Sequence, residues 1–229
     1  MPSPMNVLRD VEALKSAERH WEAKAQRPPE KAFTIALARE AGASGTLVAE
    51  EVAKRLDWPV YDQLLVERIA QEMGLRTQLL ESVDEKRKNW LLEVVEGFVS
   101  AGVSELAYVR HLAQTILSLG SHGDCVIVGR GAPLILPKET TLRVRLVASL
   151  DDRVAAISRR LTLPKDKAAK WVAETDRQRQ NFVKDHFLKD SADPHHYDLI
   201  LNMSTWSVDD CADLILHGLR ELQDRAKRA

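Results

Sequence analysis

The residues with the clearest chemical potential lie in a short turn between an apolar segment, 33–38, and a helix-like segment, 47–56. The turn contains Gly42, Ala43, Ser44, Gly45 and Thr46. Backbone N–H groups in such a turn point toward a bound anion, and the following helix adds the positive end of its dipole. The segment therefore predicts a site that binds phosphate groups through the main chain.

One residue of the common phosphate-binding loop is missing. The signature G-x-x-x-x-G-K-[ST] has a lysine where this chain has Gly45, and Arg39 stands where the first glycine would be. We expect Arg39 to supply the substitute positive charge. The alternative is a local ion pair with Glu40 at the end of the strand, which contributes little by itself. The pattern favours nucleotide binding more strongly than catalysis.

A second candidate is Arg130, which follows an apolar run, 125–128, and lies between Gly129 and Gly131. Glycines on both sides remove side chains that would block the approach of a ligand. The forked guanidinium of arginine matches the geometry of phosphate. We therefore expect Arg130 to bind an anion, and the alternative is a purely structural turn.

Other reactive residue types give no such pattern. Cys125 and Cys211 lack the spacing of metal ligands, so we expect buried free thiols. His186, His195 and His196 match no recognised ligand spacing, and the last two read as part of a surface loop. No G-x-S-x-G motif or Cys/His pair indicates nucleophilic catalysis.

Composition sets broad limits on the class of protein. The 229 residues suit one domain, and 45% apolar with 29% charged residues favours a folded core over disorder. The net charge of −1 gives no general attraction to nucleic acid or to a membrane surface. No apolar run approaches the roughly 18 residues that span a bilayer, and the first residues lack the order of a secretory signal. We expect a cytoplasmic protein.

The coarse pattern along the chain alternates strands with helices. Strands are expected at 33–39, 57–62, 123–131, 142–148 and 197–202. Helices are expected at 47–56, 63–73, 77–119 with a break near 102–104, 151–160, 163–186 and 207–220. Gly74 is expected to stop a helix, and Asp151 or Asp152 to begin one. This alternation predicts an α/β fold with a mainly parallel sheet covered on both faces.

The segment 5–26 precedes this pattern and reads as an amphipathic helix. Its apolar positions fall on one face at Val7, Val11, Leu14, Ala17 and Trp21. We expect it to dock on the core of its own chain or on a second subunit, so a homodimer is plausible. The alternative is a helix that only adds packing.

Five segments in this order resemble the cytidylate kinase-like family, a branch of the P-loop nucleoside-monophosphate kinases. The segments are 38–45, 60–62, 126–131, the pair 146–148 and 152–153 followed by 176–179, and 197–202. The resemblance covers roughly residues 33–216. It implies a three-layer P-loop kinase-like domain over 32–222, after an N-terminal helical extension, 1–31, and before a tail, 223–229. A helical acceptor-side insert would occupy about 75–120, and a lid about 159–190.

The resemblance implies a phosphotransferase that moves a phosphoryl group from ATP to a nucleoside monophosphate, with Mg²⁺ bridging the phosphates. Gly42, Ala43, Ser44 and Gly45 would wrap the ATP phosphates, and Thr46 would bind Mg²⁺. Asp62 and Arg130 would bind the acceptor. Arg159, Arg160 and Asp176 would belong to the lid. The arginines that stabilise the transferring group would be Arg39, Arg130, Arg177 and Arg179.

The chain also departs from full cytidylate kinases. Those enzymes have an acidic residue on each side of the glycine–arginine pair, where this chain has Val128 and Gly131. CMP itself is therefore one option among nucleoside monophosphates and related small phosphate acceptors, and the insert leaves room for an acceptor that is not a nucleotide. The alternative function is a nucleotide-binding regulatory or scaffold protein that has lost catalysis.

Overall fold

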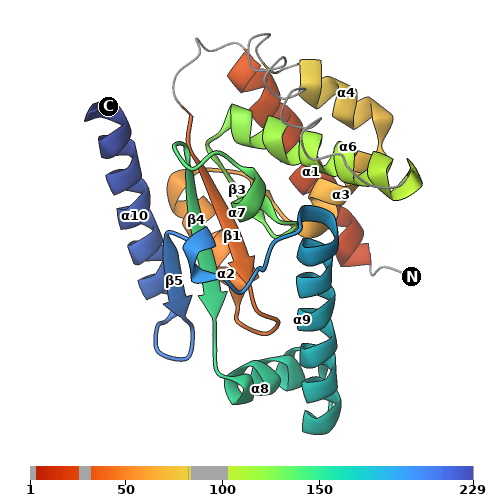
Figure 1. The fold of residues 1–229 in the computed structure, drawn as a ribbon, viewed down its shortest axis with the longest axis vertical. Coiled ribbons are helices and arrows are strands. Elements are labelled where there is room, and N and C mark those ends of the chain that lie inside the picture. The colour runs from red at the N-terminus through yellow and green to blue at the C-terminus, as the bar shows by residue number, and fades with distance from the viewer. Residues whose placement is uncertain (1–3, 26–31, 82, 84–102, 229) are drawn as a thin grey trace.

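The computed structural model describes residues 4–25, 32–81, 83 and 103–228. Within them, five parallel strands form one sheet in the order β2-β3-β1-β4-β5 (Figure 1). The strands are β1 (Thr34–Arg39), β2 (Val60–Tyr61), β3 (Cys125–Val128), β4 (Thr141–Val147) and β5 (Leu199–Asn202). β1 lies at the centre, where Ile35 pairs with Val126 and Leu142. Its apolar run, 35–38, suits a strand that is buried on both faces.

Helices cover both faces of the sheet, which confirms the expected α/β fold. On one face, Leu37 of β1 packs in a core shared with α2 (Gly45–Leu56) and α10 (Val208–Arg228). On the other, Ala36 packs in a larger core. The helices of that second face are α1 (Pro4–Ala25), α3 (Gln63–Gln71), α4 (Met73–Glu81), α6 (Val103–His122) and α7 (Ala132–Ile135). Successive residues of β1 thus serve opposite layers, as strand geometry requires.

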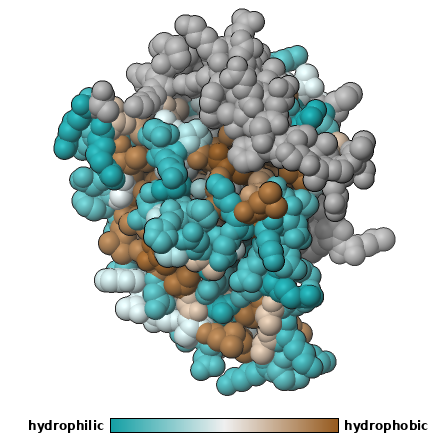
Figure 2. Space-filling model, in the orientation of Figure 1, coloured by the Kyte–Doolittle hydropathy of each residue, from teal (hydrophilic) through white to brown (hydrophobic). Residues whose placement is uncertain are grey.

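Two helices project from the carboxyl end of the sheet. They are α8 (Leu150–Leu161) and α9 (Lys165–Phe187), which lie at the bottom and lower right of Figure 1. Ile157 and Val172 form a small apolar core between them. In the same orientation, Figure 2 shows this end as mainly hydrophilic, with a brown patch between the helices. A short 3₁₀ turn, η1 (Pro194–His196), then leads into β5.

The N-terminal helix α1 docks on the core of its own chain. Ala17 and Trp21 are buried, and the Trp21 Nε1–H group donates to the Tyr61 hydroxyl at 2.9 Å. His20 Nε2 lies 3.0 Å from the carbonyl oxygen of Gly123. The side chains of Val7 and Val11 fall outside the part of the helix whose side chains are described. This docking confirms the first of the two expected arrangements, and a homodimer stays a prediction.

Three expected helix boundaries were wrong. Gly74 does not stop a helix but lies in the first turn of α4, because α3 already ends at Gln71. α8 is capped by Ser149, whose hydroxyl accepts from the Asp152 N–H group at 3.2 Å, instead of by Asp151 or Asp152. α10 continues to Arg228, eight residues or so beyond the expected end, because its apolar face still packs at Leu222 and Ala226.

The structure also bears on the two cysteines and on the question of a membrane-spanning helix. Cys125 and Cys211 are buried free thiols, as expected. Among the described residues, no helix combines the length and the apolar content needed to cross a membrane. The expected helical break near 102–104 borders 84–102, which lie outside the described residues.

Candidate functional site

The candidate site lies where three neighbouring strands end. Arg39 is the last residue of β1, Asp62 directly follows β2, and Arg130 is the second residue after β3. Because all strands are parallel, their carboxyl ends meet at one edge of the sheet, where ligands of open α/β folds bind. The fold therefore brings together residues that are up to 91 positions apart in sequence, counted from Arg39 to Arg130.

The loop 40–46 has the backbone conformation of an anion-binding turn. Gly42 has φ +85° and Ser44, the residue before α2, has φ 51°. In the described part of the chain, the N–H groups of Gly42, Ser44, Gly45 and Thr46 have no protein acceptor. These residues line a cleft of about 730 Å³. Free amides at a helix N-terminus facing a cleft are suited to bind phosphate oxygens.

Ala43 differs from its neighbours in the loop. Its N–H group donates to the Glu40 carbonyl oxygen at 3.2 Å, and its side chain is buried. Its amide thus closes the turn in this structure, and the expected part of Ala43 in phosphate binding stays a prediction. Gly42 is also fixed by packing, since a Cβ atom there would lie 2.6 Å from the carbonyl oxygen of Arg153. The turn is thus shaped by α8 as well as by its own sequence.

The Arg39 side chain passes directly over Gly45, the position of the missing lysine. A Cβ atom at Gly45 would lie 2.6 Å from Cγ of Arg39. At its far end, the Arg39 guanidinium fills the space that a side chain at Gly129 would need. Two glycines therefore make the channel for this arginine, and Arg39 occupies the space beside the loop where a lysine would extend.

Arg39 carries a positive charge without a close partner. Its pKa is lowered to about 9, mainly by burial and then by the nearby Arg179 and Arg130, while Asp62 acts in the opposite direction. Across residues 4–25, 32–81, 83 and 103–228, no hydrogen bond or ion pair reaches its guanidinium. The alternative ion pair with Glu40 is absent, because Glu40 lies 3.4 Å from Arg153 and 3.7 Å from Arg145. A bound anion would relieve this uncompensated charge.

Arg130 sits on a strained turn beside Arg39. It has φ 50°, between Gly129 at 88° and Gly131 at 74°, so three successive residues are left-handed. Its guanidinium pairs with Glu67 and lies 4.5 Å from the centre of the Phe182 ring. Its Nε–H group is buried without a partner. Burial, then Arg179, lowers the pKa of Arg130. Backbone strain of this kind persists where the surroundings hold it, often at binding sites.

Helix α9 supplies the third arginine and holds it over the loop. Nη1 of Arg179 donates to the carbonyl oxygen of Arg39 at 3.1 Å. Burial lowers the pKa of Arg179, against the opposing effect of Asp176. The Asp176 carboxylate accepts from the Ala41 N–H group at 2.7 Å and also pairs with Arg153. Asp176 therefore ties α9 to the loop 40–46.

The remaining lid arginines lie outside this cluster. Arg177 is 67% exposed and pairs with Glu174 on the same helix, so the structure does not bring it to the site. Arg159 and Arg160 line the outer part of the cleft and are exposed. The Arg160 guanidinium lies 5.6 Å from the centre of the Trp171 ring. Sequence position alone could not separate Arg177 from Arg179, which face different sides of one helix.

The comparisons with known proteins agree with this geometry. Residues 34–205 match the cytidylate kinase-like family. The chain belongs to that family. Membership supports nucleotide phosphotransfer in general, and it leaves the substrate open. The matched region begins at β1 and excludes α1, which lies outside the shared family segment.

Solved structures of other proteins resemble this cytidylate kinase-like chain to different degrees. An uncharacterised protein from Eubacterium ventriosum is 20% identical, with a TM-score of 0.67 over 82% of this chain and 98% of its own. Shikimate kinase from Bacteroides thetaiotaomicron is 14% identical, with a TM-score of 0.47 over 82% and 98%. The YorR protein of Bacillus subtilis in complex with phosphorylated GDP is 14% identical, with a TM-score of 0.43 over 84% and 98%. No protein with a curated description matches the sequence.

The cleft also offers oxygen ligands beside the phosphate loop. Thr46, Glu50 and Asp62 all line it, and the Asp62 carboxylate caps α3 by accepting from the Leu65 N–H group at 2.9 Å. In the described residues, no group of three or more His, Cys, Asp or Glu side chains could hold a metal ion. A hydroxyl and one or two carboxylates nevertheless suit Mg²⁺, which keeps most of its water ligands and binds phosphate.

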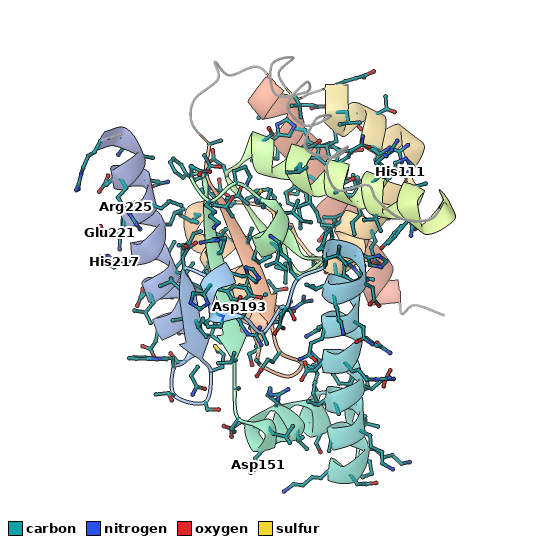
Figure 3. All side chains as sticks on the ribbon, viewed as in Figure 1. His111, Asp151, Asp193, His217, Glu221 and Arg225 are labelled. Atoms are coloured by element: carbon teal, nitrogen blue, oxygen red, sulfur yellow. The ribbon has the colours of Figure 1, made fainter. Side chains whose placement is uncertain are left out.

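Among the described residues, no histidine lines the cleft, although the His186 ring packs 4.7 Å from that of Phe182. His195 is 90% exposed and bonds to Asp193, which begins the 3₁₀ turn. Figure 3 labels Asp193 near the centre of the view, His111 of α6 at the upper right and His217 of α10 at the left. The structure therefore places His195 and His196 in a polar turn, as the sequence indicated.

Three residues of the site were not predicted as site residues. Glu67 neutralises Arg130, Phe182 stacks on it, and Arg153 braces both Asp176 and the loop. Phe182 lies three positions after Arg179 in a helix, so a shared face could have been inferred. Glu67 had no such signal, because its approach to Arg130 depends on how α3 packs against the sheet.

Proposed function

We propose that this protein transfers a phosphoryl group from ATP to a nucleoside monophosphate, CMP-like in kind, or to a related small phosphate acceptor. The observation that carries the proposal is the convergence of three arginines beside the free loop amides. Burial and then Arg179 lower the pKa of Arg39 and of Arg130, and Arg130 also lowers the pKa of Arg39. Burial lowers the pKa of Arg179 itself. Asp62, Glu67 and Asp176 offset this positive charge only in part. Such an excess of buried positive charge favours a polyanionic ligand.

Phosphoryl transfer needs positioning and charge neutralisation more than a nucleophilic side chain. An oxygen of the acceptor phosphate attacks the γ-phosphorus of ATP, and the bond from that phosphorus to the β,γ-bridging oxygen breaks. The amides of Gly42, Ser44, Gly45 and Thr46 bind the donor phosphates. Arg39 and Arg179 lie where they stabilise charge on the transferring group, and Arg130 binds the acceptor phosphate.

The residues present fit ATP with Mg²⁺. Thr46, with the Glu50 carboxylate beside it, would hold the cation, which would supply further neutralisation of the phosphate oxygens when bound, while Asp62 stays on the acceptor side. Arg39 supplies the cationic role of the missing lysine, with a fork of N–H donors in place of one ammonium group. We also propose that the protein is cytoplasmic, as expected from the sequence.

CMP itself receives less support than the reaction class. Full cytidylate kinases have acidic residues at the two positions that are Val128 and Gly131 here. Val128 is buried in the core, and a Cβ atom at Gly131 would lie 2.6 Å from Cε2 of Phe187. No acidic side chain could take those places without local rearrangement. Contacts to the acceptor's base or sugar must therefore come from other residues.

A coupled assay of ATP consumption tests the proposal across nucleoside monophosphates and small phosphorylated acceptors. We expect acceptor-dependent turnover that Arg39→Ala or Arg130→Ala reduces by about 10²- to 10³-fold. Tight ATP binding with no turnover on any acceptor would favour the second candidate, a nucleotide-binding regulator. The hydrogen bond from the Ala41 N–H group to Asp176 holds α9 on the loop, and this contact favours the regulator.

A further inference from the structure

A second cavity, of about 300 Å³, adjoins the phosphate-binding cleft. It is enclosed by α1, α2, α3 and the segment around β2. Ala13 and Ser16 of α1 form one wall, and Trp58, Val60 and Leu65 form apolar walls opposite. The cavity is thus completed by a helix that lies outside the matched family segment. We call it the α1 cavity.

The α1 cavity and the cleft share a polar boundary. Thr46, Glu50 and Asp62 line both spaces, so the two are contiguous at the N-terminus of α2. Asp62 also acts on the charge of Arg39 and raises its pKa. A ligand whose phosphate meets the arginine cluster could therefore extend past Asp62 into the α1 cavity. This connection is what distinguishes the cavity from an isolated packing defect.

The lining of the α1 cavity selects a kind of chemical group. Glu50 and Asp62 carry carboxylates, which accept hydrogen bonds when ionised and repel phosphate. Among the described residues, Arg68 is the one cationic residue that lines the cavity, and it pairs with Glu72 at 2.8 Å. The apolar walls with Trp58 suit a flat or ring-shaped group, as pockets of this kind usually do. The best match is an uncharged ring that bears hydroxyl or amino donors.

We propose that the α1 cavity binds the hydroxyl- or amino-bearing ring portion of the phosphate acceptor, so that α1 is part of the acceptor site. The inference rests on the proposed function, because the arginine cluster must hold the acceptor's phosphate. The volume of about 300 Å³ accommodates a sugar ring or nucleobase. It also accounts for the ring contacts that Val128 and Gly131 cannot make.

The experiment uses the full-length chain and ligands that lack phosphate. The four ribonucleosides are titrated at millimolar concentration, and the indole N–H resonance of Trp58, assigned through Trp58→Phe, reports occupation of the cavity. ATP affinity is measured by calorimetry in parallel. Ala13→Phe inserts a phenyl group into the cavity. Lys15→Phe adds the same group on the exposed side of α1, where residue 15 points to solvent.

We expect at least one ribonucleoside to shift the Trp58 resonance. Ala13→Phe should weaken that binding at least about tenfold, while Lys15→Phe leaves it within twofold. Glu50→Gln, which keeps the side-chain size, should also weaken it and so guards against a folding defect in Ala13→Phe. A response from no ribonucleoside, or one that Ala13→Phe leaves unchanged, would overturn this inference while ATP binding stayed intact. Loss of ATP binding in the wild type would instead overturn the proposed function.

Discussion

The Arg39 side chain occupies the space that a side chain at Gly45 would need, so residue 45 can only be glycine while Arg39 keeps this position. The Arg39 side chain lies so close to Gly45 that a Cβ atom there would come within 2.6 Å of its Cγ. A lysine at residue 45 and an arginine at residue 39 are therefore incompatible without rearrangement. The positive charge beside the loop comes from Arg39 at the end of β1, instead of from a lysine at the N-terminus of α2. Glycine at residue 45 leaves the space that the Arg39 side chain needs.

Gly45→Ala should destabilise the protein by about 1–3 kcal/mol, because its methyl group overlaps the aliphatic part of Arg39. Gly74→Ala is the matched control. Nothing lies within 4 Å of a Cβ atom at Gly74, in the first turn of α4. That change should be neutral or stabilise by up to about 1 kcal/mol. Urea unfolding measures both, and equal effects would show that Arg39 does not occupy the space above Gly45.

Arg39→Met should stabilise the ligand-free protein at neutral pH by roughly 1–3 kcal/mol, since the change removes a buried, unpaired charge. The pKa of Arg39 is lowered to about 9, so above that pH the unfolded chain binds a proton that the folded chain has released. Stability of the wild type therefore rises with pH between about 9 and the ordinary range of arginine. The advantage of Arg39→Met should shrink over that interval.

Thermal unfolding at a series of pH values measures this effect. Arg220→Met, on an exposed position of α10, is the control and should change stability by less than about 0.5 kcal/mol at every pH. A wild type that is more stable than Arg39→Met at neutral pH without ligand would mean that Arg39 has a compensating partner.

Asp176→Asn should loosen the lid helix. The carboxylate accepts from the Ala41 amide and pairs with Arg153, and both contacts are shielded from solvent. We expect a loss of about 1–3 kcal/mol and faster hydrogen exchange at Ala41 and along α9. Glu174→Gln removes an exposed carboxylate from the same helix and should leave exchange at Ala41 unchanged. Equal exchange in both variants would argue against the tie.

Arg130→Ala should raise the KM for the acceptor by at least about tenfold while changing the affinity for ATP much less, because Arg130 lies at the end of β3, away from the loop amides. Arg177→Ala should leave both constants within about twofold, since Arg177 pairs with Glu174 at the surface. A strong effect of Arg177→Ala on turnover would show that Arg177 takes part in catalysis, as the family resemblance implies.

The sequence predicted the elements of the sheet and the glycine-bearing turn between β1 and α2 correctly because their signals are local. The apolar run before Gly42 and the glycines beside Arg130 act through their own backbones. From the sequence, Arg39 was predicted only to supply the positive charge of the lysine that is missing at residue 45. That the two side-chain positions overlap depends on how β1 meets α2, which residue spacing does not determine.

Packing between elements far apart in the sequence determines which partner each charged residue meets, and the residue pattern alone did not predict these partners. Glu40 pairs with Arg145 and Arg153 instead of Arg39, because adjacent residues of a strand point to opposite faces. Helix α9 presents Arg179 to the loop and Arg177 to solvent for the analogous reason on a helix. The wall that α1 adds to a cavity beside the loop follows from its docking through Trp21 and Tyr61, which lie 40 residues apart.

The central claim is that Arg39, in place of a lysine, binds the phosphates of a nucleotide together with the loop amides. Isothermal titration calorimetry of ATP with Mg²⁺ into the wild type and Arg39→Met tests it most directly. The account predicts measurable binding by the wild type and at least about tenfold weaker binding by Arg39→Met. No heat from the wild type with millimolar ATP or GTP, or equal affinity of the two proteins, would contradict it.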